Sequence, residues 1–144
     1  MAIRLVLLAH HYRSDWEYTP EVLDQALPAG SVDELWVFFP DPWKKSRHTK
    51  RRLVSEDFVP TAERALKPGG VLRLATDWSD YAKQMREVMD MATGFERAFD
   101  GDWAKRFDGR VLTAFEEKGA KAGRDIRDLT YRRTEDSLEL KASL

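Results

Sequence analysis

The stretch Glu34-Leu35-Trp36-Val37-Phe38-Phe39, which ends at Pro40, is the clearest structural signal in the chain. It is a continuous run of aromatic, aliphatic and β-branched residues, a pattern typical of a strand that is buried on both faces. A second apolar run, from Val71 to Ala75, predicts another strand. Because a helical pattern separates the two runs, we expect parallel neighbouring strands joined by a crossover. The sequence therefore predicts an α/β fold.

Three segments around these strands have helical signals. Pro20 suits the first turn of a short helix over residues 21–27, and Ser55 is suited to cap a helix that runs to Leu66. Residues 67–70, Lys-Pro-Gly-Gly, predict the turn that ends this second helix. A third helix over residues 79–93 has a continuous apolar face, made of Tyr81, Met85, Val88, Met89 and Ala92. Residues 95–99 and 126–132 predict two further strands.

The amino-terminal segment is ambiguous, because its apolar run is too short to separate a helix from a strand. We favour a helix over residues 2–13, so we expect a helical segment at 1–30, a main domain at 31–133 and a tail at 134–144. An uncovered strand at 34–39 would leave its ladder donors and acceptors open. We therefore expect the amino-terminal segment to cover this edge, or the chain to form a homo-oligomer through it.

Composition limits the class of protein. The 144 residues suffice for one domain, and 24 Lys plus Arg nearly balance 25 Asp plus Glu. The absence of cysteine excludes a disulfide scaffold, a thiolate zinc site and a cysteine nucleophile. No apolar run approaches the ~20 residues of a membrane helix, and no cluster has metal-ligand spacing. We expect a soluble cytoplasmic protein without a metal.

The loop after the first strand concentrates positive charge. Asp41 stands between Pro40 and Pro42, and Trp43 follows together with six cations, Lys44, Lys45, Arg47, Lys50, Arg51 and Arg52. Lysine and arginine neutralise phosphates, and a tryptophan can stack on an unpaired base. The alternative is a solvated basic loop whose Trp43 plugs the end of the sheet. The residues alone leave both interpretations open.

Two acidic residues follow the two predicted strands. Asp41 comes after the first and Asp77 after the second, at the edge where sheets of this kind bind ligands. Asp77 could instead cap the helix that begins near residue 79. His48 lies among cations that disfavour its protonated form, which leaves a role as general base open, and we favour a hydrogen-bond donor to a phosphate or to the loop. Thr113 and Glu116 have the spacing of a capping box.

Residues 32–133 resemble the carboxyl-terminal half of the bacterial tRNA (guanine-N7)-methyltransferases. The matching stretches occur in the same order as in that family and are 39–48 (FPDPWKKSRH), 50–52 (KRR), 66–70 (LKPGG), 75–78 (ATDW), 113–116 (TAFE) and 128–131 (DLTY). The resemblance implies a partial Rossmann-like methyltransferase fold, namely the carboxyl-terminal half of its sheet. It also implies transfer of a methyl group from S-adenosylmethionine to N7 of guanine in tRNA.

The resemblance also assigns roles to single residues. Asp41 matches the active-site acid, and Lys45 and Asp77 match substrate-binding positions. The set Thr113, Ala114, Phe115 and Glu116 matches a further substrate-binding element. The remaining residues of the basic loop would then bind RNA, namely Trp43, Lys44, Arg47, His48, Lys50, Arg51 and Arg52.

The chain departs from this family at its amino-terminal end. The family's glycine-rich loop after its first strand has no counterpart here, because the first glycine is Gly30. The cofactor site is therefore expected to be incomplete. Residues 2–27 instead resemble a helical segment of cysteinyl-tRNA synthetases and of the related mycothiol-pathway cysteine ligase. The alternative function is a tRNA- or RNA-binding module without catalysis, or a recombined or engineered fragment without activity.

Overall fold

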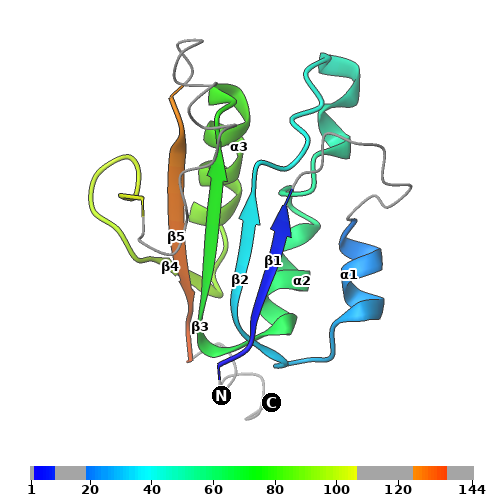
Figure 1. The fold of residues 1–144 in the computed structure, drawn as a ribbon, viewed down its shortest axis with the longest axis vertical. Coiled ribbons are helices and arrows are strands. Elements are labelled where there is room, and N and C mark those ends of the chain that lie inside the picture. Colours follow the sequence, from blue (N-terminus) through cyan, green and yellow to red (C-terminus); the bar gives the residue numbers. More distant parts are fainter. Residues whose placement is uncertain (1, 9–18, 107–124, 136–144) are drawn as a thin grey trace.

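A computed structural model describes residues 2–8, 19–106 and 125–135. Five strands form one mixed sheet in the order β1-β2-β3-β5-β4 (Figure 1). The strands are β1 (Arg4–Leu8), β2 (Val32–Phe38), β3 (Leu66–Thr76), β4 (Phe95–Arg97) and β5 (Arg127–Arg133). The first three are mutually parallel, and β5 is antiparallel to both β3 and β4. The α/β class and the parallel pairing of the two predicted strands are confirmed.

The helices alternate with the parallel strands along the chain. They are α1 (Pro20–Ala26), α2 (Phe58–Ala65) and α3 (Ser79–Asp90), and a 3-10 helix, η1 (Ser46–Arg51), lies in the basic loop. In Figure 1, α2 and α3 lie behind the sheet and η1 stands above the ends of the parallel strands. The last two strands match the predictions at 95–99 and 126–132 to within a few residues.

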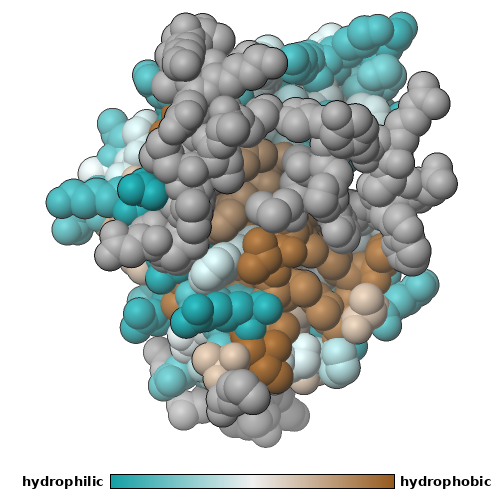
Figure 2. All heavy atoms as spheres, viewed as in Figure 1, coloured by the Kyte–Doolittle hydropathy of each residue, from teal (hydrophilic) through white to brown (hydrophobic). Residues whose placement is uncertain are grey.

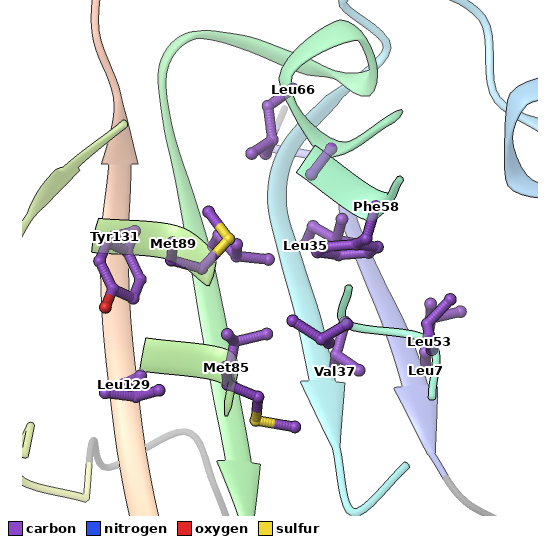
Figure 3. Packing of buried hydrophobic residues seen from close by; sticks show 14 of the residues in the cluster. Leu7, Leu35, Val37, Leu53, Phe58, Leu66, Met85, Met89, Leu129 and Tyr131 are labelled. Atoms are coloured by element: carbon purple, nitrogen blue, oxygen red, sulfur yellow. The ribbon is translucent and has the colours of Figure 1, made fainter. Parts of the chain in front are cut away.

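The core lies between this helical layer and the sheet (Figure 3). Leu35 and Val37 of β2 face Phe58 of α2, and Met85 and Met89 of α3 cover β3 and β5. All five side chains are at most 1% exposed. The predicted apolar face of α3 is therefore confirmed, although the helix ends at Asp90, three residues before the expected end.

The predicted helix at residues 2–13 is wrong for the part that the structure describes. Residues 4–8 form β1, which pairs in register with β2 from Arg4↔Glu34 to Leu8↔Phe38. The open edge of β2 offers a row of backbone partners, and that pairing outweighs the weak helical pattern of a five-residue run. Leu7 is buried whereas Val6 is exposed, the alternation of a strand. The chain's own amino-terminal residues thus cover the edge, as one of the two expected outcomes.

The glycine pair after α2 belongs to a strand rather than to a turn. β3 begins directly after α2, and its register with β2 shifts between Val32 and Glu34. Gly69 has a φ of +76°, and a Cβ on Gly70 would approach the backbone oxygen of Asp33 to 3.0 Å. A bulge of this kind needs residues without side chains. The start of α2 also differs, because Asp57 rather than Ser55 occupies the N-cap position.

One face of the sheet carries apolar side chains near β1 and β2 (Figure 2). Ile3 is 51% exposed and Val6 is 40% exposed. The described residues contain no helix that is long and apolar enough to cross a membrane. Self-association through the sheet edge stays a prediction.

Candidate nucleic-acid interface

Asp41 and Asp77 lie at the same edge of the sheet. The strands that precede them, β2 and β3, are parallel neighbours with Phe38 opposite Ala75. The ladder continues one step further, because the Phe39 N–H donates to the Ala75 carbonyl at 2.8 Å. Both acids therefore follow the carboxyl ends of adjacent strands, and these strand ends form the upper rim of the sheet in Figure 1. This is the edge at which open α/β sheets bind ligands.

The turn that contains Asp41 has an unusual backbone. Phe39 has a φ of 53° and Trp43 a φ of 42°, values that are rare for aromatic residues. The Trp43 N–H donates to Asp41 Oδ1 at 2.9 Å, which closes a local turn through the carboxylate. Conformations of this kind cost about 1–3 kcal/mol each and persist only where surrounding contacts hold them. Strain of this kind clusters at functional sites.

Arg52 supplies those contacts. Its guanidinium donates to the Pro42 carbonyl at 2.6 Å, to Gln84 Oε1 at 2.8 Å and to Asp80 Oδ2 at 2.9 Å. It also lies over the Tyr81 ring, 4.9 Å from the centroid. Arg52 is only 3% exposed. Its donors tie the loop to α3 and it does not face solvent, so the structure gives Arg52 an anchoring role, and its predicted binding of RNA stays a prediction.

Tyr81 supports the same loop from the helix side. Its hydroxyl accepts from the Val54 N–H at 2.9 Å, and the Gln84 amide donates to the Val54 carbonyl at 3.0 Å. Burial raises the pKa of Tyr81 well above its usual range, and the Asp41 charge adds to that rise. Tyr81 therefore stays neutral and acts as a fixed hydrogen-bonding group.

Four of the predicted RNA-binding cations face solvent, and they are Lys44, Arg47, Lys50 and Arg51. The predicted substrate-binding residue Lys45 is also exposed.

The loop's aromatic residue is only half-buried. Arg51 lies over the Trp43 ring at 5.1 Å, and His48 approaches the same ring edge-on at 5.9 Å between centroids. Trp43 therefore organises the basic loop itself, and it does not fill the sheet end as a fully buried plug would. The stacking role predicted for it stays a prediction.

Asp77 does not occupy the helix cap that was the alternative for it. Trp78 holds the N-cap position of α3, and its side chain makes no capping bond. The Trp78 N–H donates to Thr76 Oγ1 at 3.2 Å, and the Lys44 ammonium lies 4.9 Å above the indole centroid. Sequence reasoning missed Trp78. The signal was present, since a large aromatic residue directly follows an acid at a strand end.

Thr113, Ala114, Phe115 and Glu116 lie outside the described residues, so the substrate-binding role of these four residues stays a prediction. Within the described ranges, no group of three or more histidines and acids could hold a metal ion.

Within the described residues, no glycine-rich loop follows any of the three parallel strands, so a site for S-adenosylmethionine in this chain stays a prediction. Methyltransferase-type sheets cradle the nucleotide part of the cofactor with a glycine-rich loop after the first strand, where small residues let the backbone approach the ligand. Here β1 is followed by residues without any glycine before Gly30. Among the described residues, the rim presents acids, aromatics and cations.

Comparisons with known proteins agree on one family. A family model described as "Putative methyltransferase" matches residues 12–129. The chain is 41% identical over 162 residues to the tRNA (guanine-N(7)-)-methyltransferase of Paenarthrobacter aurescens, covering 79% of this chain and 54% of that protein. It is 47% identical over 116 residues to the enzyme of the same name from Photobacterium profundum, covering 80% and 47%. The chain spans about half the length of the curated relatives it matches.

Among solved structures, a SAM-dependent methyltransferase from Archaeoglobus fulgidus aligns with 79% of this chain and 64% of its own, with 7% identity and a TM-score of 0.44.

Proposed function

Because the chain belongs to the methyltransferase family whose model matches residues 12–129, we propose that it carries the acceptor-binding half of a tRNA guanine-N7 methyltransferase. It binds tRNA through the basic loop and holds a guanine at the rim between Asp41 and Asp77. The observation that carries this proposal is the meeting of both acids and the cationic loop at one edge of the sheet.

Guanine N7 suits this set of groups. It is itself a lone-pair nucleophile, so methyl transfer requires alignment of the reacting atoms more than a strong base. The purine gains positive charge as the new bond forms, and the carboxylates of Asp41 and Asp77 stabilise that charge. They can also accept hydrogen bonds from the Watson–Crick edge of an unpaired or extruded base. S-adenosylmethionine, when bound, supplies an electrophilic methyl group.

The loop from Trp43 to Arg51 binds the RNA backbone. Its cations face solvent and replace the counterions of phosphates, which makes affinity fall as salt rises. The helical turn of η1 and the buried Arg52 hold those cations on a defined surface next to Asp41. A preorganised loop loses less entropy when RNA binds than a flexible one.

A second candidate function is tRNA binding without methyl transfer. The observation that favours it is the exposed set of cations in the basic loop, which can bind phosphates whether or not a methyl donor binds. In that case the rim positions a base and the loop binds phosphates, while no donor binds.

Methyl transfer from labelled S-adenosylmethionine to an unmodified tRNA transcript tests the first function. We expect transfer to guanine N7 and its loss when the transcript carries 7-deazaguanosine, which lacks the acceptor nitrogen. Asp41→Asn should lower the rate by about 100-fold or more, with tRNA affinity retained. Asp100→Asn, at an exposed loop position after β4, is the control and should leave the rate unchanged.

Calorimetry with the cofactor separates the two candidates. No binding of S-adenosylmethionine and no methyl transfer, together with salt-dependent tRNA affinity, would rule out the enzyme and support the binding module. Absence of tRNA binding would contradict both functions.

A further inference from the structure

A contact between a lysine and a tryptophan joins the loop after β2 to the segment after β3. The Lys44 ammonium, from the loop after β2, lies 4.9 Å above the ring centroid of Trp78, which directly follows Asp77 after β3. A cation over an indole is attracted by the electron-rich face of the ring. The free protein therefore holds a positive charge on an aromatic surface, beside one of the two acids.

Trp78 is a rigid platform. Its side chain is half-buried and packs against the hydrophobic core. Its backbone N–H donates to Thr76 Oγ1 at 3.2 Å, and its backbone carbonyl accepts the Ala82 N–H at 2.9 Å in the first turn of α3. Its position is therefore set before any ligand arrives.

Lys44, in contrast, is held weakly. Its side chain is exposed, and no ion pair found within the described part of the chain joins it to a carboxylate. A lysine on a flexible four-carbon stem can leave the face of a half-buried aromatic ring at little cost. A planar ligand could then take its place on the indole.

Trp103 also has cations over its indole ring, but they are held more firmly than Lys44. Trp103 has Arg86 at 4.4 Å and Arg127 at 5.5 Å from its centroid. Arg86 is fixed by a hydrogen bond to the Asp102 carbonyl at 3.1 Å. Two guanidinium groups occupy that ring, so Trp103 offers no comparable platform and serves as a matched control.

Resting on the proposed function, we propose that Trp78 is the surface on which the target purine stacks. We further infer that the Lys44 ammonium marks where the purine's positive charge develops. In N7 alkylation the N7 lone pair forms the new N–C bond, and the C–S bond of the sulfonium breaks with its electron pair left on sulfur. The positive charge thereby passes to the purine ring. A cationic ring gains a cation–π attraction to the indole that a neutral ring lacks, so Trp78 favours the product-like state.

Binding of guanosine monophosphate and 7-methylguanosine monophosphate to the full chain tests this inference. Calorimetry is done at mildly acidic pH, where the methylated base keeps its positive charge. We expect the methylated nucleotide to bind about fivefold tighter than the unmodified one. Trp78→Leu should remove this preference and weaken both nucleotides, by about 5- to 150-fold for a lost stacking partner. Trp103→Leu should leave both affinities unchanged.

Lys44→Gln provides a second test that does not alter the core. It removes the resident cation, so the affinity for the methylated nucleotide should rise about twofold. Equal affinities of the two nucleotides, no detectable binding, or a preference that survives in a folded Trp78→Leu protein would each overturn the inference. If Trp78→Leu does not fold, an unchanged affinity of Lys44→Gln for the methylated nucleotide would likewise overturn the inference.

These measurements are independent of the proposed function, because they use neither tRNA nor a methyl donor. A chain that prefers the methylated nucleotide but fails to methylate tRNA keeps the purine platform and loses the catalytic proposal. A chain that methylates tRNA without this preference keeps the catalytic proposal and loses the platform.

Discussion

Replacing Arg52 should destabilise the protein far more than removing its acidic partner. In Arg52→Met the half-buried Pro42 carbonyl and the Gln84 amide oxygen each lose a donor at 2.6 and 2.8 Å. Hydrogen bonds to charged groups contribute about 1.5–3 kcal/mol each, and part of this is offset because a buried guanidinium no longer has to be desolvated. We expect a net loss of about 3 kcal/mol in the free energy of unfolding. Arg52→Lys should recover little, because an ammonium cannot reproduce the planar fork.

Asp80→Asn is the matched control. The Asp80 side chain is 72% exposed whereas that of Arg52 is 2% exposed. An ion pair with one partner in solvent contributes at most about 1 kcal/mol. Urea denaturation, with the slope compared between variants, measures both changes. If Asp80→Asn costs as much as Arg52→Met, the stabilisation comes from the ion pair and the reasoning about the backbone anchor is refuted.

Three further predictions concern the loop, the sheet edge and pH. Lys45→Ala and Arg47→Ala should each weaken tRNA binding and lower the magnitude of the slope of log affinity against log salt by about 0.7–0.9. Lys83→Ala, at an exposed position on α3, is the control and should change neither quantity. Unchanged slopes in the two loop variants would exclude phosphate contacts. Leu7→Ala should lower the free energy of unfolding, measured by urea denaturation, by about 2–4 kcal/mol because Leu7 is only 5% exposed. Val6→Ala, at a side chain that is 40% exposed, should lower it by less than about 1 kcal/mol. Equal losses in the two variants would place β1 outside the cooperatively folded structure. The hydrogen bond from the Arg97 guanidinium lowers the pKa of Asp90 below its usual 3.8, so the stabilisation that Asp90 contributes is complete above pH 3.8 and is lost as pH falls through the lowered pKa. In Asp90→Asn, the melting temperature should therefore fall less steeply with decreasing pH in the acid range. The same acid dependence of the melting temperature in both proteins would contradict this assignment.

The elements with long or strongly patterned sequence could be predicted, because burial dictates them directly. The run from residue 34 to 39 became β2, and the apolar stripe of α3 became its buried face. The strand at residues 4–8 could not be predicted, because five residues carry too little periodicity and the deciding partner is the edge of β2, thirty residues away. The expectation that this edge needed cover was itself a physical argument, and it identified the outcome that the local pattern missed.

For the candidate site, the sequence placed both acids correctly at one edge, since the carboxyl ends of parallel strands coincide. It could not rank the cations of the basic loop, because burial is a property of three dimensions and Arg51 and Arg52 are neighbours in sequence. Arg51 lies over Trp43 in solvent, whereas Arg52 enters the protein and meets the α3 side chains. A run of positively charged residues in the sequence therefore predicts a positively charged surface, but it does not predict which of these residues face solvent and which are buried.

The same contrast explains how a loop with two strained residues can hold an acid in place. The positive φ values at Phe39 and Trp43 disfavour this turn on its own. Two hydrogen bonds offset the free-energy cost of these φ values. Arg52 donates to the Pro42 carbonyl, and the backbone N–H of Trp43 donates to the Asp41 carboxylate. The second bond uses one lone pair of Oδ1, so the other lone pair of that oxygen and both lone pairs of Oδ2 can still accept hydrogen bonds. In the proposed function, the Asp41 carboxylate both closes the turn and contacts the base, so a substitution that relaxes the turn should weaken base binding even when the charge of Asp41 is kept.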